Sequence, residues 1–118
     1  MALVGVLTWT NRDVDPNDLA GDWKSMNTRY TIVVEGGTPR VSSVVDEDDG
    51  ERMVVESCTW NKATLSWVLQ VPSTGTRVQE SLYATRSGLA LGMLNGTYSS
   101  SHTPGGGVVG AAVFTRQR

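Results

Sequence analysis

Eight short segments with alternating apolar and polar residues, joined by tight turns, constrain the fold of this chain more than any other feature. Valine, isoleucine, threonine, tyrosine and tryptophan recur in them with a period of two, which is typical of half-buried strands. Most connectors are short enough for hairpins, so each strand is expected to run antiparallel to the next. The sequence therefore predicts an all-β fold, an eight-stranded antiparallel up-and-down β-barrel. The expected strands span residues 21–26, 29–35, 40–46, 52–60, 65–71, 76–85, 89–94 and 108–116.

The first residues depart from this pattern, and we expect an N-terminal extension over residues 1–18 before a barrel over residues 19–118. Asp15 as a capping residue and Pro16 in the first helical position favour a short helical turn just before the first strand. The apolar segment 3–10 has two interpretations. It could cover the open end of the barrel as a lid, or pair as a strand with a neighbouring subunit in a homo-oligomer.

Charge and cysteine content exclude several classes of function. The 118-residue chain has a formal net charge of -2, and its ten Lys and Arg residues are scattered singly. No basic stripe can follow a phosphate backbone, so no nucleic-acid partner is expected. The single cysteine, Cys58, excludes an internal disulfide framework. The apolar start lacks a basic n-region and no transmembrane-length segment follows, so the chain is interpreted as soluble and cytoplasmic, without a membrane partner.

No cofactor and no metal are expected. The acidic run 46–50 lacks the spacing and the closing glutamate of an EF-hand, and is typical of a solvated hairpin tip. The only histidine, His102, lies in the Ser- and Gly-rich stretch 95–107, which is expected to be a long loop, so a haem or zinc site built on histidines is not available. The glycines 105–107 precede a strand rather than a helix, which removes the usual mechanism for cradling phosphate. Cys58 is expected to be a small buried residue rather than a nucleophile.

The inward faces of the strands decide what the barrel can hold. Eight strands enclose a space that side chains can fill or that can accept one small ligand. Gly110 and Ala112 share the inward face of the last strand, so the wall there is thin, and we expect free volume in the middle of the barrel. The residues expected to point inward are Gly21, Trp23, Ser25, Tyr30, Ile32, Val34, Val41, Ser43, Val45, Met53, Val55, Ser57, Leu65, Trp67, Leu69, Val78, Glu80, Leu82, Leu89, Leu91, Met93, Gly110, Ala112, Phe114 and Arg116.

Glu80 is the exceptional member of this inward set. It shares its face with Val78 and Leu82, and an ionised carboxylate inside an apolar barrel is costly unless it is paired or protonated. We still place it inside, because the opposite face of the same strand is far more polar, with Arg77, Gln79, Ser81, Tyr83 and Thr85. Glu80 is therefore expected to have a raised pKa and to be the residue whose loss most alters function.

The two ends of the expected barrel resemble the calycin superfamily, which includes lipocalins, fatty-acid-binding proteins and avidins. The motifs are Gly-X-Trp, which ends at Trp23, and Phe-Thr-Arg, which ends at Arg116. The resemblance implies that the Trp23 indole packs against the Arg116 guanidinium at the closed end. Eight strands, short hairpins and no C-terminal helix make the chain most similar to avidins. An avidin-type biotin site would need Asn or Asp where Ala112 stands, so biotin is not the expected ligand.

These features favour a barrel that encloses one small, mostly apolar molecule. The alternative is a cofactor-independent cyclase or isomerase of natural-product biosynthesis, which would hold a reactive chain in a near-attack geometry. In that case Glu80 and Tyr30 would be the catalytic residues, polarising a carbonyl or moving a proton. A structural or protein-binding barrel is the third class, and a filled interior would point to it. The expected ligand-binding residues are Ser25, Tyr30, Ser43, Ser57, Trp67, Leu69, Glu80, Leu91, Met93 and Ala112.

Overall fold

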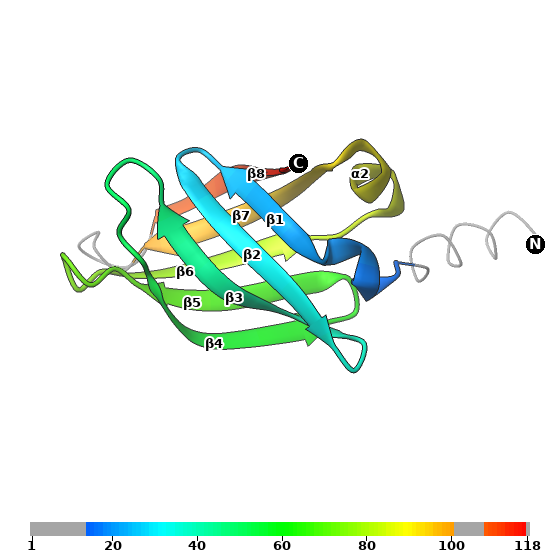
Figure 1. Ribbon diagram of the computed structural model, residues 1–118, viewed down its shortest axis with the longest axis horizontal. Coiled ribbons are helices and arrows are strands. Elements are labelled where there is room, and N and C mark those ends of the chain that lie inside the picture. Colours follow the sequence, from blue (N-terminus) through cyan, green and yellow to red (C-terminus); the bar gives the residue numbers. More distant parts are fainter. Residues whose placement is uncertain (1–13, 101–107, 118) are drawn as a thin grey trace, which may run out of the picture.

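All eight strands of the computed structural model, which describes residues 14–100 and 108–117, belong to one sheet that curls into a nearly closed barrel (Figure 1). Neighbouring strands are antiparallel throughout and pair in the order β3-β2-β1-β8-β7-β6-β5-β4. The predicted all-β, up-and-down architecture is thereby confirmed. The elements are η1 (Pro16–Leu19), β1 (Gly21–Ser25), β2 (Thr28–Glu35), β3 (Thr38–Asp46), β4 (Val54–Asn61), β5 (Thr64–Gln70), β6 (Arg77–Tyr83), α2 (Arg86–Leu91), β7 (Met93–Ser100) and β8 (Val108–Arg116).

The barrel has a seam between β3 and β4. Among the described residues these two strands form no continuous ladder of paired residues, and an isolated bridge joins Val45 of β3 to Arg52, in the segment that leads to β4. Beside the bridge, the Met53 amide donates a 2.9 Å hydrogen bond to the Val44 carbonyl. Further along the seam, a thiol replaces the strand partner, because the Val41 amide donates to Sγ of Cys58 at 3.5 Å.

The predicted helical turn is the 3-10 helix η1. The Asp15 carboxylate caps it by accepting a hydrogen bond from the Asn17 amide, and Pro16 occupies its first turn. Leu19, at its end, is completely buried. In Figure 1, η1 and α2 lie at the same end of the barrel, on the right of the view. The expected lid segment 3–10 lies outside the described residues.

The predicted strand 89–94 is wrong, because residues 86–91 form helix α2. The Thr85 hydroxyl caps the helix by accepting from the Gly88 amide, and Gly92 ends it with a left-handed φ of 74°. Leu91 and Met93, expected to face the interior, are 79% and 52% exposed. The real strand β7 occupies the first half of the expected loop 95–107, and the rest of that loop, 101–107, is not described.

Two β-bulges correct the inward placement of Ser43 and Ser57. In β3 the register shifts at Ser42, so Val44 is buried and Ser43 instead accepts a hydrogen bond from Arg52. In β4 the shift falls at Glu56, which leaves Ser57 exposed. One extra residue reverses which face every later side chain occupies, because the side-chain period of a strand is two.

The middle of the barrel is filled rather than hollow, which corrects the expectation drawn from the small residues of the last strand. The rings of Tyr30, Trp67 and Phe114 pack against one another with centroids 5.2 to 5.9 Å apart. A Cβ on Gly96 would meet Cε1 of Phe114 at 2.6 Å, and one on Gly110 would meet the Tyr98 ring at 2.5 Å. At these two positions the glycines therefore leave room for aromatic rings.

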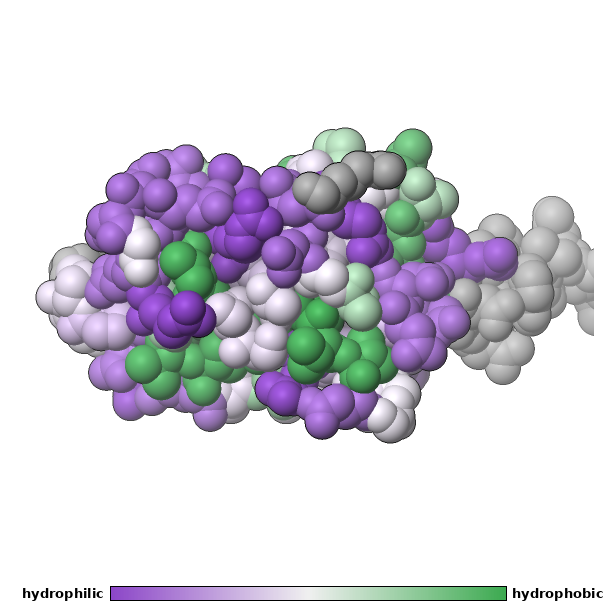
Figure 2. All heavy atoms as spheres, viewed as in Figure 1, coloured by the Kyte–Doolittle hydropathy of each residue, from purple (hydrophilic) through white to green (hydrophobic). Residues whose placement is uncertain are grey.

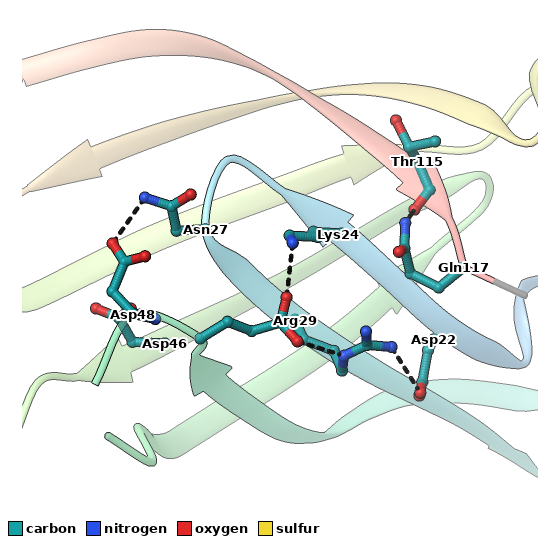
Figure 3. Close-up of polar contacts among 9 residues, drawn as sticks. Asp22, Lys24, Asn27, Arg29, Asp46, Asp48, Thr115 and Gln117 are labelled. Carbon is teal, nitrogen blue, oxygen red and sulfur yellow. Dashed lines mark hydrogen bonds and ion pairs between the residues drawn. The ribbon is translucent and has the colours of Figure 1, made fainter. Parts of the chain in front are cut away.

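The outside of the barrel is mainly hydrophilic on the face shown in Figure 2, with separate hydrophobic patches. Glu47, which follows β3, forms ion pairs with Lys24 of β1 at 2.7 Å and with Arg29 of β2 at 3.0 Å. Arg29 also pairs with Asp22 of β1 at 3.2 Å (Figure 3). Hydrogen bonds from Lys24 and Arg29 lower the pKa of Glu47. The acidic run 46–50 is thus a hairpin tip held by cations and by the Asn27 amide, which donates to Asp48.

The described residues contain neither a cluster of metal-ligating side chains nor a helix of membrane-spanning length. Across 14–100 and 108–117, no cluster of three or more His, Cys, Asp or Glu side chains is arranged to hold a metal ion. No helix in that same part of the chain is long and apolar enough to cross a membrane.

Candidate functional site: a pocket at the mouth of the barrel

One end of the barrel is closed by Trp23 and Arg116. The buried Trp23 indole donates a 2.9 Å hydrogen bond to the Leu19 carbonyl, and the Arg116 guanidinium lies 4.3 Å from the centre of its ring. Arg116 also donates to the carbonyl of Ala20 at 3.0 Å and to that of Asp18. The predicted contact between Trp23 and Arg116 is confirmed. An opening to the interior is therefore expected at the opposite end of the barrel, near the end of β1 and the start of β8.

A pocket of about 470 Å³ lies there, at what we call the mouth of the barrel. It is framed by the hairpin between β1 and β2 and by strands β6, β7 and β8. Because Gly110 has no side chain, the Tyr98 ring can lie over it and form part of the pocket wall. The lining residues are Ser25, Met26, Thr28, Tyr30, Val78, Glu80, Tyr98, Ala111, Ala112 and Val113.

Among the described lining residues Glu80 is the only acidic one, and it is 8% exposed. Its Oε2 accepts a 2.8 Å hydrogen bond from the Tyr30 hydroxyl, which also lies 3.0 Å from Oε1. Oε1 accepts a further hydrogen bond, 2.9 Å long, from the Trp67 indole. Trp67 and Tyr98 are the direct neighbours of Glu80 on the two adjacent strands, whereas Tyr30 reaches it from β2. The carboxylate is thus held in position by neutral donors from two different sides.

Burial sets the electrostatics of this group. Loss of hydration raises the pKa of Glu80, and the hydrogen bonds from Tyr30 and Trp67 oppose that rise without cancelling it. Burial and the neighbouring Glu80 charge raise the pKa of Tyr30, which therefore stays a hydrogen-bond donor. Within the described ranges no cation contributes to the pKa of Glu80. The Arg116 guanidinium, which was also expected to point inward, contacts Trp23 and the Ala20 carbonyl at the closed end.

The structure brings together four of the predicted site residues: Ser25, Tyr30, Glu80 and Ala112 line the pocket. The inward orientation predicted for Glu80 is confirmed, and its role in binding stays a prediction. Trp67 and Leu69 are buried and line no part of the pocket, although Trp67 supports Glu80 from behind. The remaining four, Ser43, Ser57, Leu91 and Met93, do not line the mouth.

Sequence reasoning missed Tyr98, since it assigned residues 95–107 to a loop. The alternation of Leu94, Gly96 and Tyr98 carried the missing signal, because it matches the period of two of a strand. Leu94 is buried, Gly96 faces the Phe114 ring and Tyr98 reaches the mouth. Pairing this strand with the small residues of the last strand would have predicted the wall of the pocket.

Two other hollows lie elsewhere on the described surface. One, of about 640 Å³, lies between η1 and α2 at the closed end, and another, of about 330 Å³, follows the seam between β3 and β4. Their charged side chains, such as Asp18, Arg86, Arg52 and Glu56, are not buried. The mouth pocket is a better candidate for a binding site than either of these hollows, although it is smaller than the closed-end one. Of the three, it alone has a buried ionisable group in its lining.

Comparisons with known proteins add little about function. No family model and no curated protein matches the chain. Among solved structures, the chain is similar to the crystal structure of Treponema pallidum Tp0751 (pallilysin), with a TM-score of 0.48 and 13% identity over 98% of each chain. A likeness this weak transfers no ligand, activity or partner to the present chain.

Proposed function

We propose that this protein binds one small, mostly apolar molecule in the mouth pocket. The observation that carries the proposal is a buried carboxylate, Glu80, in the wall of a pocket that is otherwise mainly apolar. Val78, Ala112 and Val113 offer apolar contact, and Tyr30 stands beside Glu80 as a second polar group. A few polar groups in an apolar lining are typical of small-molecule sites, where they orient the ligand.

The size of the pocket limits the ligand. A volume of about 470 Å³ lies within the usual range of small-molecule sites. The Tyr30, Trp67 and Phe114 rings fill the barrel below it, so the ligand occupies the mouth and does not extend through the barrel. A compact ring system or a short branched chain fits this space best.

We also propose that the barrel is calycin-like. Two observations support this: the strands follow up-and-down order, and the first-strand tryptophan meets the last-strand arginine at the closed end. The cytoplasmic location, the independence from cofactors and a homo-oligomeric state remain proposals drawn from the sequence.

Native mass spectrometry of the full-length chain, purified without added ligand, tests the binding function directly. We expect a co-purifying small molecule, or saturable binding of a naphthalene-based fluorescent dye. Ala112→Leu should weaken binding, because it fills the pocket. Ala90→Leu is the matched control, because Ala90 is exposed on α2 at the other end of the barrel. Equal binding by both variants, with both folded by circular dichroism, would contradict the proposed site.

An isomerase or cyclase is the second candidate, and the hydrogen bond between Tyr30 and Glu80 favours it. A carboxyl group whose pKa is raised by burial holds its proton more readily than an exposed one and can act as a proton donor or acceptor, and such a group lines the pocket here. If the co-purifying molecule is converted to an isomer of equal mass, Glu80→Gln should slow conversion far more than it weakens binding. Conversion at an unchanged rate would rule out this role for Glu80.

A further inference from the structure

Provided that the mouth pocket binds a small molecule, we infer that it selects a cationic one. The ligand class is a protonated amine on a compact apolar or aromatic body. Its ammonium group would be received by the Glu80 carboxylate beside Tyr30, and its apolar body would contact Val78 and Ala112.

The first reason is the uncompensated charge of Glu80. The ion pairs of the described residues, such as Lys24–Glu47 and Arg40–Glu35, lie on the outside of the barrel, and none includes Glu80. The partners of Glu80 are a phenol and an indole, which supply hydrogen bonds but no positive charge. Burying an ionised carboxylate without a cation is unfavourable, so a cationic ligand gains an interaction that a neutral one lacks.

The second reason is the free acceptor capacity of the carboxylate. An ionised carboxylate can accept about four hydrogen bonds. Oε1 receives the Trp67 indole and shares the Tyr30 hydroxyl, whereas Oε2 receives only Tyr30. Since Glu80 lines the pocket, its carboxylate keeps acceptor capacity for an ammonium donor beside the donors that orient it. Charge-assisted hydrogen bonds of this kind are about twice as strong as neutral ones.

The third reason is the composition of the lining. Its titratable side chains are Glu80 on β6, Tyr30 on β2 and Tyr98 on β7, and no basic side chain lines the pocket in the described ranges. An anionic ligand would meet a like charge, while the two tyrosine rings are groups that tolerate or attract a cation. Charge complementarity thus separates the three ligand classes in the order cation, neutral, anion.

Proton linkage gives the inference a second signature. Because burial raises the pKa of Glu80, its carboxyl in the free protein takes up a proton at a higher pH than an exposed glutamate does. An ammonium ligand binds only the ionised form well, so its binding releases that proton. The affinity for the amine should therefore fall as pH is lowered through the pKa of Glu80, while the affinity for a neutral analogue should change little.

Three matched probes test the selectivity by calorimetry on the full-length chain. They are the cationic 2-(1-naphthyl)ethylamine, the neutral 2-(1-naphthyl)ethanol and the anionic carboxylate of 1-naphthaleneacetic acid, called the acetate below. At pH 7.5 we expect the amine to bind roughly tenfold or more tightly than the alcohol, and the acetate to bind weakest. Glu80→Gln should bring the amine and the alcohol to within about twofold of each other while the alcohol keeps its affinity. Glu35→Gln removes an exposed carboxylate on β2 and should leave all three affinities unchanged.

The outcomes separate the inference from the function on which it rests. If the alcohol or the acetate binds as tightly as the amine, cation selectivity is wrong and the binding function stands. If no probe binds and no molecule co-purifies, the binding function itself fails. If Glu80→Gln does not fold, the three probe affinities of the wild-type chain and the pH dependence of its amine binding decide whether the pocket selects a cation. A pH-independent affinity for the amine, with no proton released in buffers of different ionisation enthalpy, would overturn the inference.

Discussion

The two ends of the barrel each place a charged side chain against buried aromatic rings, and they use it in opposite ways. At the closed end, Arg116 lies over Trp23, and its hydrogen bonds go to fixed backbone carbonyls. At the mouth, Glu80 meets Tyr30 and Trp67, and the space beside it is a pocket. A charged side chain whose hydrogen bonds go to backbone carbonyls and that is enclosed by the chain has a structural role. A charged side chain that lacks a counterion and lines a pocket is available to a ligand.

Chain topology creates this contrast. Arg116 joins the end of the last strand to residues almost a hundred positions earlier, so it ties η1 to the end of β8. Leu19, in η1, is completely buried and belongs to the same hydrophobic cluster as Trp23. The mouth has no such plug among the described residues, because the β1–β2 hairpin turns at Met26 and Asn27 and leaves Ser25 at the pocket wall.

Removing the Trp23 indole from the closed end should have the largest effect on stability. Trp23→Ala deletes a fully buried indole, and we expect a loss of about 3–5 kcal/mol in the free energy of unfolding, measured by urea denaturation. Tyr98→Ala at the mouth should cost clearly less, because that ring is 36% exposed, and should mainly weaken ligand binding. Equal losses of stability would break the distinction between a structural end and a binding end.

Two glycines, Gly96 of β7 and Gly110 of β8, allow the packing of the barrel core to be compared with that of the mouth. In Gly96→Ala the new Cβ would collide with the Ser81 backbone carbonyl and the Phe114 ring, so we expect a loss of about 1–3 kcal/mol. In Gly110→Ala the three nearest atoms would all belong to the Tyr98 side chain, which is 36% exposed and is not backbone. That variant should lose less stability and change probe affinity instead, as thermal unfolding and calorimetry would show. A larger stability loss for Gly110→Ala would mean that the mouth is as rigid as the core.

Arg116→Met tests whether the cation of the closed end is structural. It removes two hydrogen bonds to carbonyls and the contact with Trp23, so we expect a loss of about 1–2 kcal/mol that varies little with salt. Arg40→Met is the control, because Arg40 pairs with Glu35 on the exposed surface and such pairs contribute at most about 1 kcal/mol, screened by salt. A strongly salt-dependent loss in Arg116→Met would contradict the structural role.

The smallest expected effect is the pH dependence that Glu80 imposes on stability. Its pKa is raised in the folded chain, so the stability it contributes is full below the unfolded-state pKa and is lost as pH rises through the folded-state pKa. Relative to wild type, Glu80→Gln should therefore gain stability across that window, in denaturation measured from acidic to neutral pH.

Glu47 supplies the control of opposite sign. Lys24 and Arg29 lower its pKa, so its contribution is present above the unfolded-state pKa and is lost as pH falls through the folded-state pKa. Glu47→Gln should therefore remove a stability that grows as pH rises, and the effect should shrink with added salt. Parallel pH profiles for Glu80→Gln and Glu47→Gln would show that Glu80 is not held in a desolvated site.

The resemblance to calycins implied the meeting of Trp23 with Arg116. The sequence by itself determined the barrel, the helical turn at Asp15 and Pro16 and the inward face of Glu80. These features follow from local signals, since a strand's period of two and a capping residue act within a few neighbours. A barrel closed in sequence order also brings its first and last strands together, whatever their other contacts.

Only the tertiary structure decided which residues complete the site. The bulges at Ser42 and Glu56 arise from pairing between strands, so no single strand pattern reveals that Ser43 and Ser57 turn away. Tyr30 reaches Glu80 from β2, which is not a neighbour of β6 in the sheet. The space beside the glycines depends on the rings that cover them. Burial, pairing and closure are properties of contacts between distant segments, and these decide where the pocket lies.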